Sequence, residues 1–194
     1  MIRSLTSIVI LCGLIVGCGV PVDEAPVAVE VEYEPASRMA ARAGESLVAA
    51  SMYLVRGERL IPVTRDLPGP PDLTAIVASL LDGPTDPEMR SQLRTAIPAG
   101  TRTLDVEVEG DIAYVDLSRE FATVGGQEEI LAIAQIVLTL TAVDGVEWVG
   151  FLLNGVATNV PLPDGALSEA PVAGSDYLEL VGLSSSGISR TGPL

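Results

Sequence analysis

The chain has 194 residues and 48% apolar content, which is enough for one compact domain with short flanking segments. Its net charge of −15, with eleven arginines and no lysine, leaves no basic stripe to neutralise phosphates and excludes DNA and RNA as partners. Histidine is absent and cysteine occurs only at Cys12 and Cys18, so the folded domain lacks the commonest general base and any thiolate. These absences exclude much enzyme chemistry, and we expect neither a metal nor a cofactor.

Residues 1–17 have the parts of a secretory signal peptide. Arg3 supplies a positive charge, and the apolar run from Leu5 to Val16 is shorter than the ~20 residues that a membrane-spanning helix needs. The run ends in Ile15-Val16-Gly17-Cys18, which resembles the bacterial lipobox. This resemblance implies that Cys18 is lipidated at its sulfur and becomes the N-terminus after cleavage. The alternative is an ordinary secretion signal that is cut nearby, with Cys18 incidental.

Residues 18–46 are predicted to form the lipidated N-terminus and a flexible tether, because prolines and acids are interspersed with alanine and valine. Alternation of Val27, Val29 and Val31 leaves an edge strand open as an alternative. Anionic headgroups attract lysine and arginine rather than an acidic domain, so the lipid on Cys18 must provide the membrane anchor. Residues 183–194 are rich in serine and glycine and are expected to be disordered.

The folded domain is expected over residues 47–182 and begins with a hairpin. Residues 47–55 and 60–63 are apolar on either side of Arg56-Gly57-Glu58, a turn-forming sequence. Pro62 marks the second strand as an edge, because proline cannot donate a hydrogen bond to a neighbouring strand.

Two helices are predicted next. Asp72 is the expected N-cap of a helix over residues 73–81, whose apolar side chains recur at helical spacing, and Gly83 and Pro84 end it. Asp86 followed by proline is typical of a second N-cap, and that helix is expected to continue to Ile97.

The second half of the domain is expected to contain a hairpin, the main helix and further strands. Residues 104–109 and 112–117 alternate apolar and polar side chains around a Gly-Asp turn. Residues 127–143 carry a broad apolar face, which predicts a mostly buried helix. Nearly continuous apolar residues at 146–153 predict a central strand that is covered on both faces.

The last predicted elements are strands. Asn154-Gly155 is a tight-turn dipeptide that leads into residues 156–160, and residues 177–181 are expected to form a final strand. The order of elements predicts an α+β fold, with two main helices packed on a small antiparallel or mixed sheet.

Six short motifs occur in an order that is similar to the GerMN domain, the module of sporulation and spore germination proteins. They are Leu60–Arg65, Leu80–Pro84, Ala96–Thr101, Ala113–Phe121, Ala134–Thr141 and Val149–Gly155. The similarity spans residues 46–181, nearly all of the expected domain.

The GerMN resemblance implies an extracytoplasmic lipoprotein domain whose fold is akin to the ring-building modules of secretion and sporulation complexes. Such modules present a sheet and two helices for protein contact. The sporulation protein of this family carries two copies in tandem, whereas this chain has a single copy. The single copy favours a stand-alone envelope lipoprotein over a role in a sporulation ring.

Two turn-forming motifs have both a structural and a functional interpretation. Leu81-Asp82-Gly83-Pro84 is expected to end a helix, and the alternative is a ligand bound by exposed backbone amides. Asn154-Gly155 is sufficiently explained as a turn, and together with Asn159 it offers a loop that could touch a ligand or a wall glycan.

Two carboxylates and the tryptophan also have both a structural and a functional interpretation. Asp116 and Glu120 are close in sequence, as acid–base chemistry would need, but we expect Asp116 or Ser118 to cap a turn. Trp148 is predicted in the core, and the alternative is an anchor in a protein interface. The acids do not form the loop pattern of a calcium site, so a solvated acidic surface is the expectation.

These observations predict a non-enzymatic lipoprotein that is anchored to the bacterial membrane through Cys18 and lies on its extracytoplasmic face. Its domain is expected to contact another envelope protein or to self-associate, through contact residues that the sequence does not identify. The alternative is a binding lipoprotein that recognises a cell-wall glycan or a small extracellular ligand. A carboxylate-only enzyme using Asp116 and Glu120 is the third possibility.

Overall fold

The structure is a computed structural model that describes residues 46–182. The predicted signal peptide, Cys18, nearly all of the predicted tether and residues 183–194 lie outside the described residues. The strands and α-helices are β1 (Leu47–Arg56), β2 (Arg59–Pro68), α2 (Leu73–Leu81), α3 (Asp86–Arg90), β3 (Thr103–Glu109), β4 (Ile112–Leu117), α4 (Gln127–Leu140), β5 (Trp148–Leu153), β6 (Val156–Ala157), β7 (Val160–Pro161), β8 (Leu167–Ser168) and β9 (Val172–Ala173). The 3₁₀ helices are η1 (Arg119–Thr123) and η2 (Gly174–Leu180).

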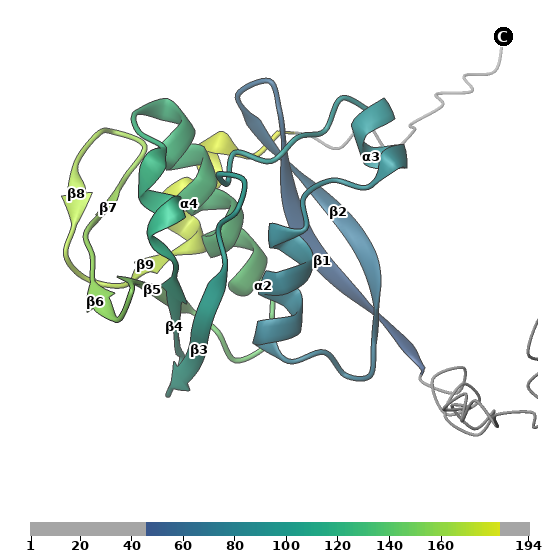
Figure 1. Ribbon diagram of the computed structural model, residues 1–194, viewed down its shortest axis with the longest axis horizontal. Helices are drawn as coiled ribbons and strands as arrows, with labels where there is room; N and C mark the ends of the chain where they lie inside the picture. Colours follow the sequence, from purple (N-terminus) through teal and green to yellow (C-terminus); the bar gives the residue numbers. More distant parts are fainter. Residues whose placement is uncertain (1–45, 183–194) are drawn as a thin grey trace, which may run out of the picture. The chain divides into compact units, whose positions relative to one another are not determined.

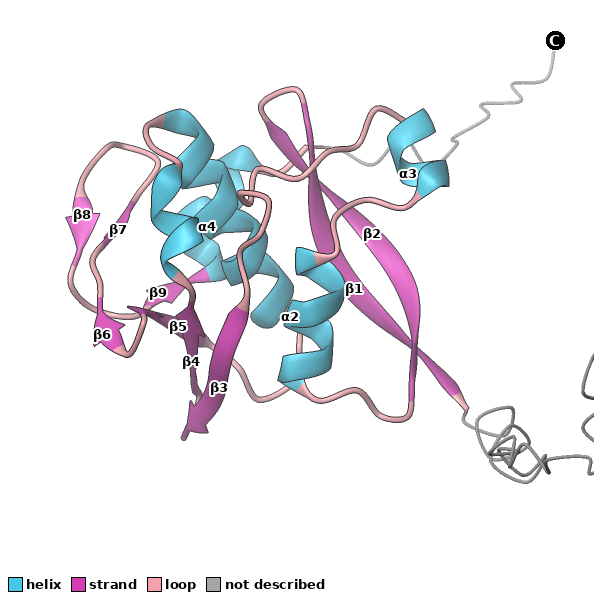
Figure 2. Ribbon diagram, in the orientation of Figure 1, coloured by secondary structure: helices cyan, strands magenta, loops and turns pink. Residues whose placement is uncertain are grey.

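Helix α4 lies at the centre of the fold, between the β1–β2 hairpin and the larger sheet (Figures 1 and 2). The larger sheet has the order β3-β4-β5-β6, and β9 also pairs with β5. β4 and β5 are parallel, and α4 lies on the connection between them, as a parallel pair requires. Every residue from Ile130 to Leu140 is buried, because this helix is covered on more than one side. The predicted α+β fold with helices on a mixed sheet is confirmed.

The first hairpin is longer than predicted and is held to α4 by polar side chains. Pro62 pairs with Tyr53, so the backbone N–H and C=O of Tyr53 face away from β2. Thr139 Oγ1 accepts the Tyr53 N–H at 3.1 Å, and Gln135 Nε2 donates to the Tyr53 C=O at 3.1 Å. Gln135 Oε1 also accepts the Ala96 N–H at 2.6 Å. The side chains of Gln135 and Thr139 are both fully buried, so they satisfy backbone groups that water cannot reach.

The first helix is as predicted, and the second is shorter. Asp72 caps α2 by accepting the Ala75 N–H at 2.7 Å. Helix α3 is capped at Thr85 rather than Asp86, and the Thr85 N–H donates to the Glu88 carboxylate at 2.6 Å. It ends at Arg90 rather than Ile97, because Gln92 has a left-handed φ of 60° that a helix does not allow.

A largely buried ion pair fixes β2 to the two short helices. Arg65 Nη2 lies 2.7 Å from Glu88 Oε2 and donates to the Gly83 C=O at 2.7 Å, while Nε reaches Glu88 Oε1 at 3.2 Å. The side chains of Arg65 and Glu88 are only 11% and 14% exposed. Burial by itself would raise the pKa of Glu88. The hydrogen bonds from Arg65 and Thr85 and the Arg65 charge outweigh burial and hold this pKa below its ordinary value.

The predicted hairpin forms as β3 and β4, with an irregularity in the register between Thr103 and Asp105, whereas later elements differ from the predictions. Helix α4 ends at Leu140, earlier than the predicted residue 143, and β5 begins at Trp148 rather than residue 146. The predicted strand at 156–160 is divided into β6 and β7, which pair with β5 and β8 respectively.

The prediction of a final strand at 177–181 is wrong, because these residues belong mainly to η2. Tyr177 is fully buried there and donates its hydroxyl to the Pro161 C=O at 2.9 Å, and burial raises the pKa of this hydroxyl. A buried tyrosine needs such a partner, so this hydrogen bond fixes η2 beside β7.

We predict that Gln135→Leu destabilises the protein. The leucine leaves the Ala96 N–H and the Tyr53 C=O without their partner, and each buried group left unpaired costs about 1–3 kcal/mol. Urea denaturation should show a free energy of unfolding that is lower by about 2–5 kcal/mol. The control is Gln127→Leu at the exposed first residue of α4, which should stay within about 0.5 kcal/mol of wild type. Equal losses in both variants would contradict the role of Gln135.

The Arg65–Glu88 pair predicts a pH-dependent stability difference between the wild type and Glu88→Gln. Because the folded pKa of Glu88 is lowered, its contribution is fully present above the pKa of an unfolded glutamate. The contribution is lost as the pH falls through the folded pKa. At neutral pH the variant should lose about 2–3 kcal/mol, and the difference should shrink in acid.

The matched control for this pair is Glu128→Gln. Glu128 also pairs with an arginine, Arg94, but these side chains are 48% and 41% exposed. Removal of this exposed pair should cost less than about 1 kcal/mol. Urea titrations of both variants across the acidic range test the comparison, and a pH-independent loss in Glu88→Gln would refute it.

Candidate functional site

One face of the larger sheet packs on α4, and the opposite face carries the polar and aromatic side chains. On β4, Ala113, Val115 and Leu117 are fully buried, whereas the alternating residues are partly exposed. The strand registers place the outward positions of β3, β4 and β5 side by side. We define the outer face by these residues: Asp105, Glu107, Glu109, Ile112, Tyr114, Asp116, Trp148, Gly150 and Leu152.

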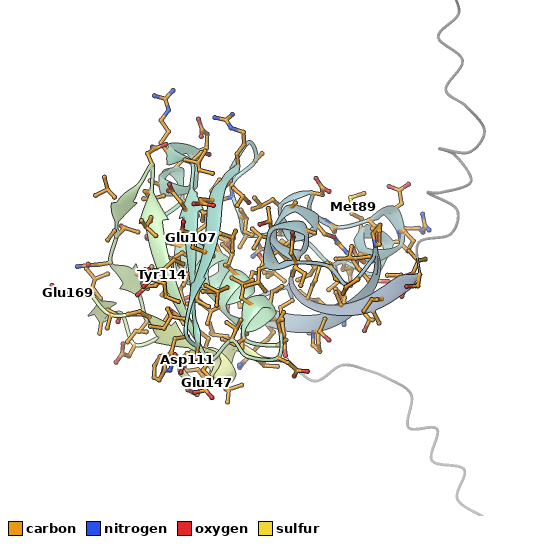
Figure 3. The ribbon with its side chains drawn as sticks, turned by 90° about the horizontal axis from the view of Figure 1, so that it is seen from below. Met89, Glu107, Asp111, Tyr114, Glu147 and Glu169 are labelled. Carbon is orange, nitrogen blue, oxygen red and sulfur yellow. The ribbon has the colours of Figure 1, made fainter. Side chains whose placement is uncertain are left out.

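Tyr114 lies at the middle of the outer face because β5 has a glycine beside it. Tyr114 pairs with Gly150 across the parallel strands. A Cβ at Gly150 would come within 2.5 Å of Tyr114 Cδ1, a distance that no side chain tolerates. The absence of a side chain at Gly150 therefore lets the tyrosine ring lie across the sheet. Figure 3 shows Tyr114 between Glu107 and Glu169.

The surface around Tyr114 is hollowed. A cavity of about 360 Å³ is lined by carboxylates and by Tyr114, Leu152 and Gly155. An adjoining hollow of about 130 Å³ shares Tyr114 and Leu152 and is bordered by Glu169 and Pro171. Together they form a groove that runs across β3, β4 and β5, which we call the outer groove.

The outer face itself contains no basic residue, and the arginines nearest to its carboxylates in the sequence, Arg102 and Arg119, both pair with Glu120. Between Thr103 and Gly182, Arg119 is the only basic residue, and it lies in η1 beside Glu120. Asp116 borders the groove, and its Oδ1 atom is buried with no hydrogen-bond partner within residues 46–182. The outer groove therefore combines an aromatic floor with negative charge that the neighbouring sequence does not neutralise.

Trp148 belongs to this outer face, and the prediction that it lies in the core is wrong. It is the first residue of β5, pairs with Ile112 and Ala173, and is 41% exposed. The continuous apolar run had suggested that both faces of β5 were covered. Only the face of Val149 and Phe151 is covered by α4, so the exposed alternative, an interface anchor, fits the position of Trp148.

The two carboxylates considered for acid–base chemistry differ in their surroundings. Asp116 faces the outer groove, whereas Glu120 lies in η1 between Arg102 and Arg119, at 3.9 Å and 3.5 Å. Hydrogen bonds from Ser118 and from the backbone, together with the Arg102 charge, lower the pKa of Glu120. A carboxyl that acts as a general acid needs a raised pKa, so Glu120 has the opposite shift.

Ser118 is at the N-cap position of η1, but its side chain has another role. Its buried hydroxyl accepts the Arg102 N–H at 3.0 Å and makes no capping hydrogen bond. The side chain therefore joins the end of β4 to the segment that precedes β3. Of the two residues expected to cap the turn, Ser118 occupies the N-cap position, but without a capping hydrogen bond from its side chain.

The two turn-forming motifs have their structural roles. Gly83 has a φ of 77° at the end of α2, as a left-handed helix terminus requires. Asn154 and Gly155 have φ values of 47° and 77°, which define a type I′ turn between β5 and β6. Gly155 also borders the outer groove. A Cβ added at Gly155 would lie 4.0 Å from Asp116 Oδ2. Asn159 lies on the exposed side of a different hollow.

Neither a metal cluster nor a membrane-spanning helix occurs in residues 46–182. No group of three or more acidic, cysteine or histidine side chains there converges on one point. No helix in the same residues is long and apolar enough to cross a membrane.

Comparison with known proteins identifies the family. The model of the Germane family, described as sporulation and spore germination, matches residues 27–159. No curated protein matches the chain. The tandem GerMN domains of the sporulation protein GerM from Bacillus subtilis share 20% identity over 75% of this chain and 52% of that chain, with a TM-score of 0.53.

Two shorter structures are also similar. The first GerMN domain of GerM has 24% identity over 65% of this chain and 94% of that chain, with a TM-score of 0.48. A candidate lipoprotein from Clostridium perfringens has 16% identity over 70% of this chain and 93% of that chain, with a TM-score of 0.47. This chain spans about half the length of the tandem structure. Because the family model covers more than half of its residues, the chain belongs to the Germane family of sporulation and spore germination proteins and contains a GerMN domain.

Proposed function

We propose that this protein is a non-enzymatic envelope lipoprotein whose GerMN domain is a protein-interaction or assembly module. The observation that carries this proposal is the outer face, where a 41% exposed tryptophan and the half-buried Tyr114 occupy outward positions of the neighbouring strands β5 and β4. Tryptophan and tyrosine are over-represented at the energetic centres of protein interfaces. These two residues on β4 and β5 support the proposal of a contact surface on the sheet.

A lipid on Cys18 and the predicted tether would act by raising local concentration. A domain that is held close to the membrane meets partners in the same plane at a higher effective concentration than a free domain does. Modest contacts at the outer face are then enough for association. The proposed side of the membrane is the extracytoplasmic one, because a lipobox signal implies export.

The binding of a cell-wall glycan or a small ligand is the alternative function. An enclosed pocket lined by apolar side chains would favour it. The outer groove is instead an open surface bordered by several carboxylates, and Trp148 lines neither of its two hollows. These features support protein contact. Crosslinking to a wall glycan is one of the outcomes that the following experiment can distinguish.

Site-specific photocrosslinking tests the proposed contact surface in cells. A photoreactive amino acid at position 148 should give a discrete crosslinked protein, because Trp148 lies on the outer face. The same amino acid at Met89, which is 53% exposed on α3 and distant from the outer face in Figure 3, should give far less. Crosslinks from position 148 to the chain itself would show self-association. Crosslinks to wall glycan alone, or equal products from both positions, would contradict the proposal.

The lipid anchor predicts a difference between the two cysteines. Cys18→Ala should move the protein from the membrane fraction to the released fraction, because no other anchor is proposed. Cys12→Ala is the matched control, since Cys12 would leave with the signal peptide and its loss should not change membrane association. Cell fractionation and immunoblotting measure both variants. Membrane retention of Cys18→Ala would show that Cys18 is not the anchor.

A further inference from the structure

We infer that the outer groove binds an extended basic segment of a partner protein, with arginine or lysine at every second position. This inference rests on the proposed function and adds the chemistry of the partner. It comes from the spacing of the carboxylates on β3, from the aromatic surface beside them and from the charge of the face.

The carboxylates of β3 are spaced like the side chains of an extended peptide. Asp105, Glu107 and Glu109 occupy alternate positions of one strand, so neighbouring carboxylates start about 6.6–6.8 Å apart. A metal ion needs ligands that converge on one point, and these carboxylates are instead arranged in a row. An extended segment that lies along β3 presents one cation every second residue at the same spacing.

Tyr114 and Asp116 extend this recognition from β3 to β4. Glu107 pairs with Tyr114 and Asp105 pairs with Asp116 in the sheet register, so each aromatic or acidic group on β4 is next to a carboxylate. A guanidinium over the tyrosine ring gains a cation–π interaction while it pairs with the adjacent carboxylate. The Asp116 Oδ1 atom, buried without a partner in the described region, gains a donor.

The charge of the face favours a basic segment over a second copy packed face to face and over an anionic lipid surface. A second copy that packed outer face to outer face would bring carboxylates against carboxylates, because the residues that define this face include four acids and no arginine. Anionic lipid headgroups would be repelled by the same carboxylates. A basic segment is the partner whose charge complements the outer face and whose approach the carboxylates would accelerate.

The fluorescence of Trp148 provides a direct test, because it is the only tryptophan in the chain and lies on the outer face. The full-length mature protein in detergent is titrated with a short peptide that alternates arginine and threonine. We expect a saturable change in fluorescence. The affinity should fall severalfold when NaCl is raised from about 50 mM to about 500 mM, because exposed charges are screened. A peptide of the same length that alternates glutamate and threonine should not bind.

Matched double variants separate the outer groove from general attraction to an acidic protein. Glu107→Gln with Asp116→Asn should weaken binding at least about fivefold, since each exposed ion pair contributes up to about 1 kcal/mol. Glu58→Gln with Asp66→Asn removes the same charge from the β1–β2 hairpin, where both residues are exposed, and should leave binding unchanged. Equal weakening by the two double variants, or no binding by the arginine peptide, would overturn the inference.

The crosslinking experiment separates failure of this inference from failure of the proposed function. A partner that crosslinks at position 148 through a segment without basic residues would leave the proposed function standing and refute the basic segment. An arginine peptide that binds as expected, with no protein crosslinked in cells, would retain the chemistry of the groove and refute the interaction module.

Discussion

The contact between α4 and the edge of β1 is the constraint on which the rest of the fold depends. A helix that is buried on nearly all sides has no solvent-facing polar stripe, so its two buried polar side chains must find partners inside the protein. Gln135 and Thr139 lie one turn apart and bond the N–H and C=O of Tyr53, while Gln135 also bonds the Ala96 N–H. These hydrogen bonds fix the rotation of α4 and protect the inner edge of the hairpin. Pro62 and Pro68 lie in β2, the other strand of the hairpin. Because proline has no backbone N–H, they discourage the free edge of β2 from pairing with a strand of another chain.

The position of α4 determines which surface remains for function. Because α4 is the crossover between β4 and β5, it covers the face formed by Val115, Val149 and Phe151. The described chain has no second helix on the opposite face, so the outward side chains of β3, β4 and β5 stay accessible. A parallel strand pair is normally covered on both faces by helices. This sheet departs from that arrangement at Tyr114 and Trp148, where a partner rather than a helix of the same chain would supply the cover.

Local patterns predicted most of the elements, and long-range contacts explain the errors. Alternating residues predicted the β3–β4 hairpin, and helical spacing predicted α2 and α4, because these signals lie within a few residues of each other. Trp148 was misplaced because an apolar run does not show which face of a strand is covered. The strand predicted around Tyr177 was wrong because its helical turns are held by a hydroxyl bond to Pro161, sixteen residues away. The outer groove depends on the β4–β5 register, which places Tyr114 on Gly150 and which no local pattern contains.

The acidic side chains of β3 have two physical explanations, which the adjacent strand distinguishes. Charges on an edge strand prevent it from pairing with other chains, and this explains alternating acids on β3 alone. It does not explain Asp116, which lies on the inner strand β4 and has a buried oxygen without a partner in the described residues. It also does not explain why Gly150 leaves the Tyr114 ring against the sheet, since a larger residue would strengthen the strand. The basic segment that we propose would account for all three features, because its successive side chains would pair with the carboxylates of β3, donate to Asp116 and place a cation on the Tyr114 ring.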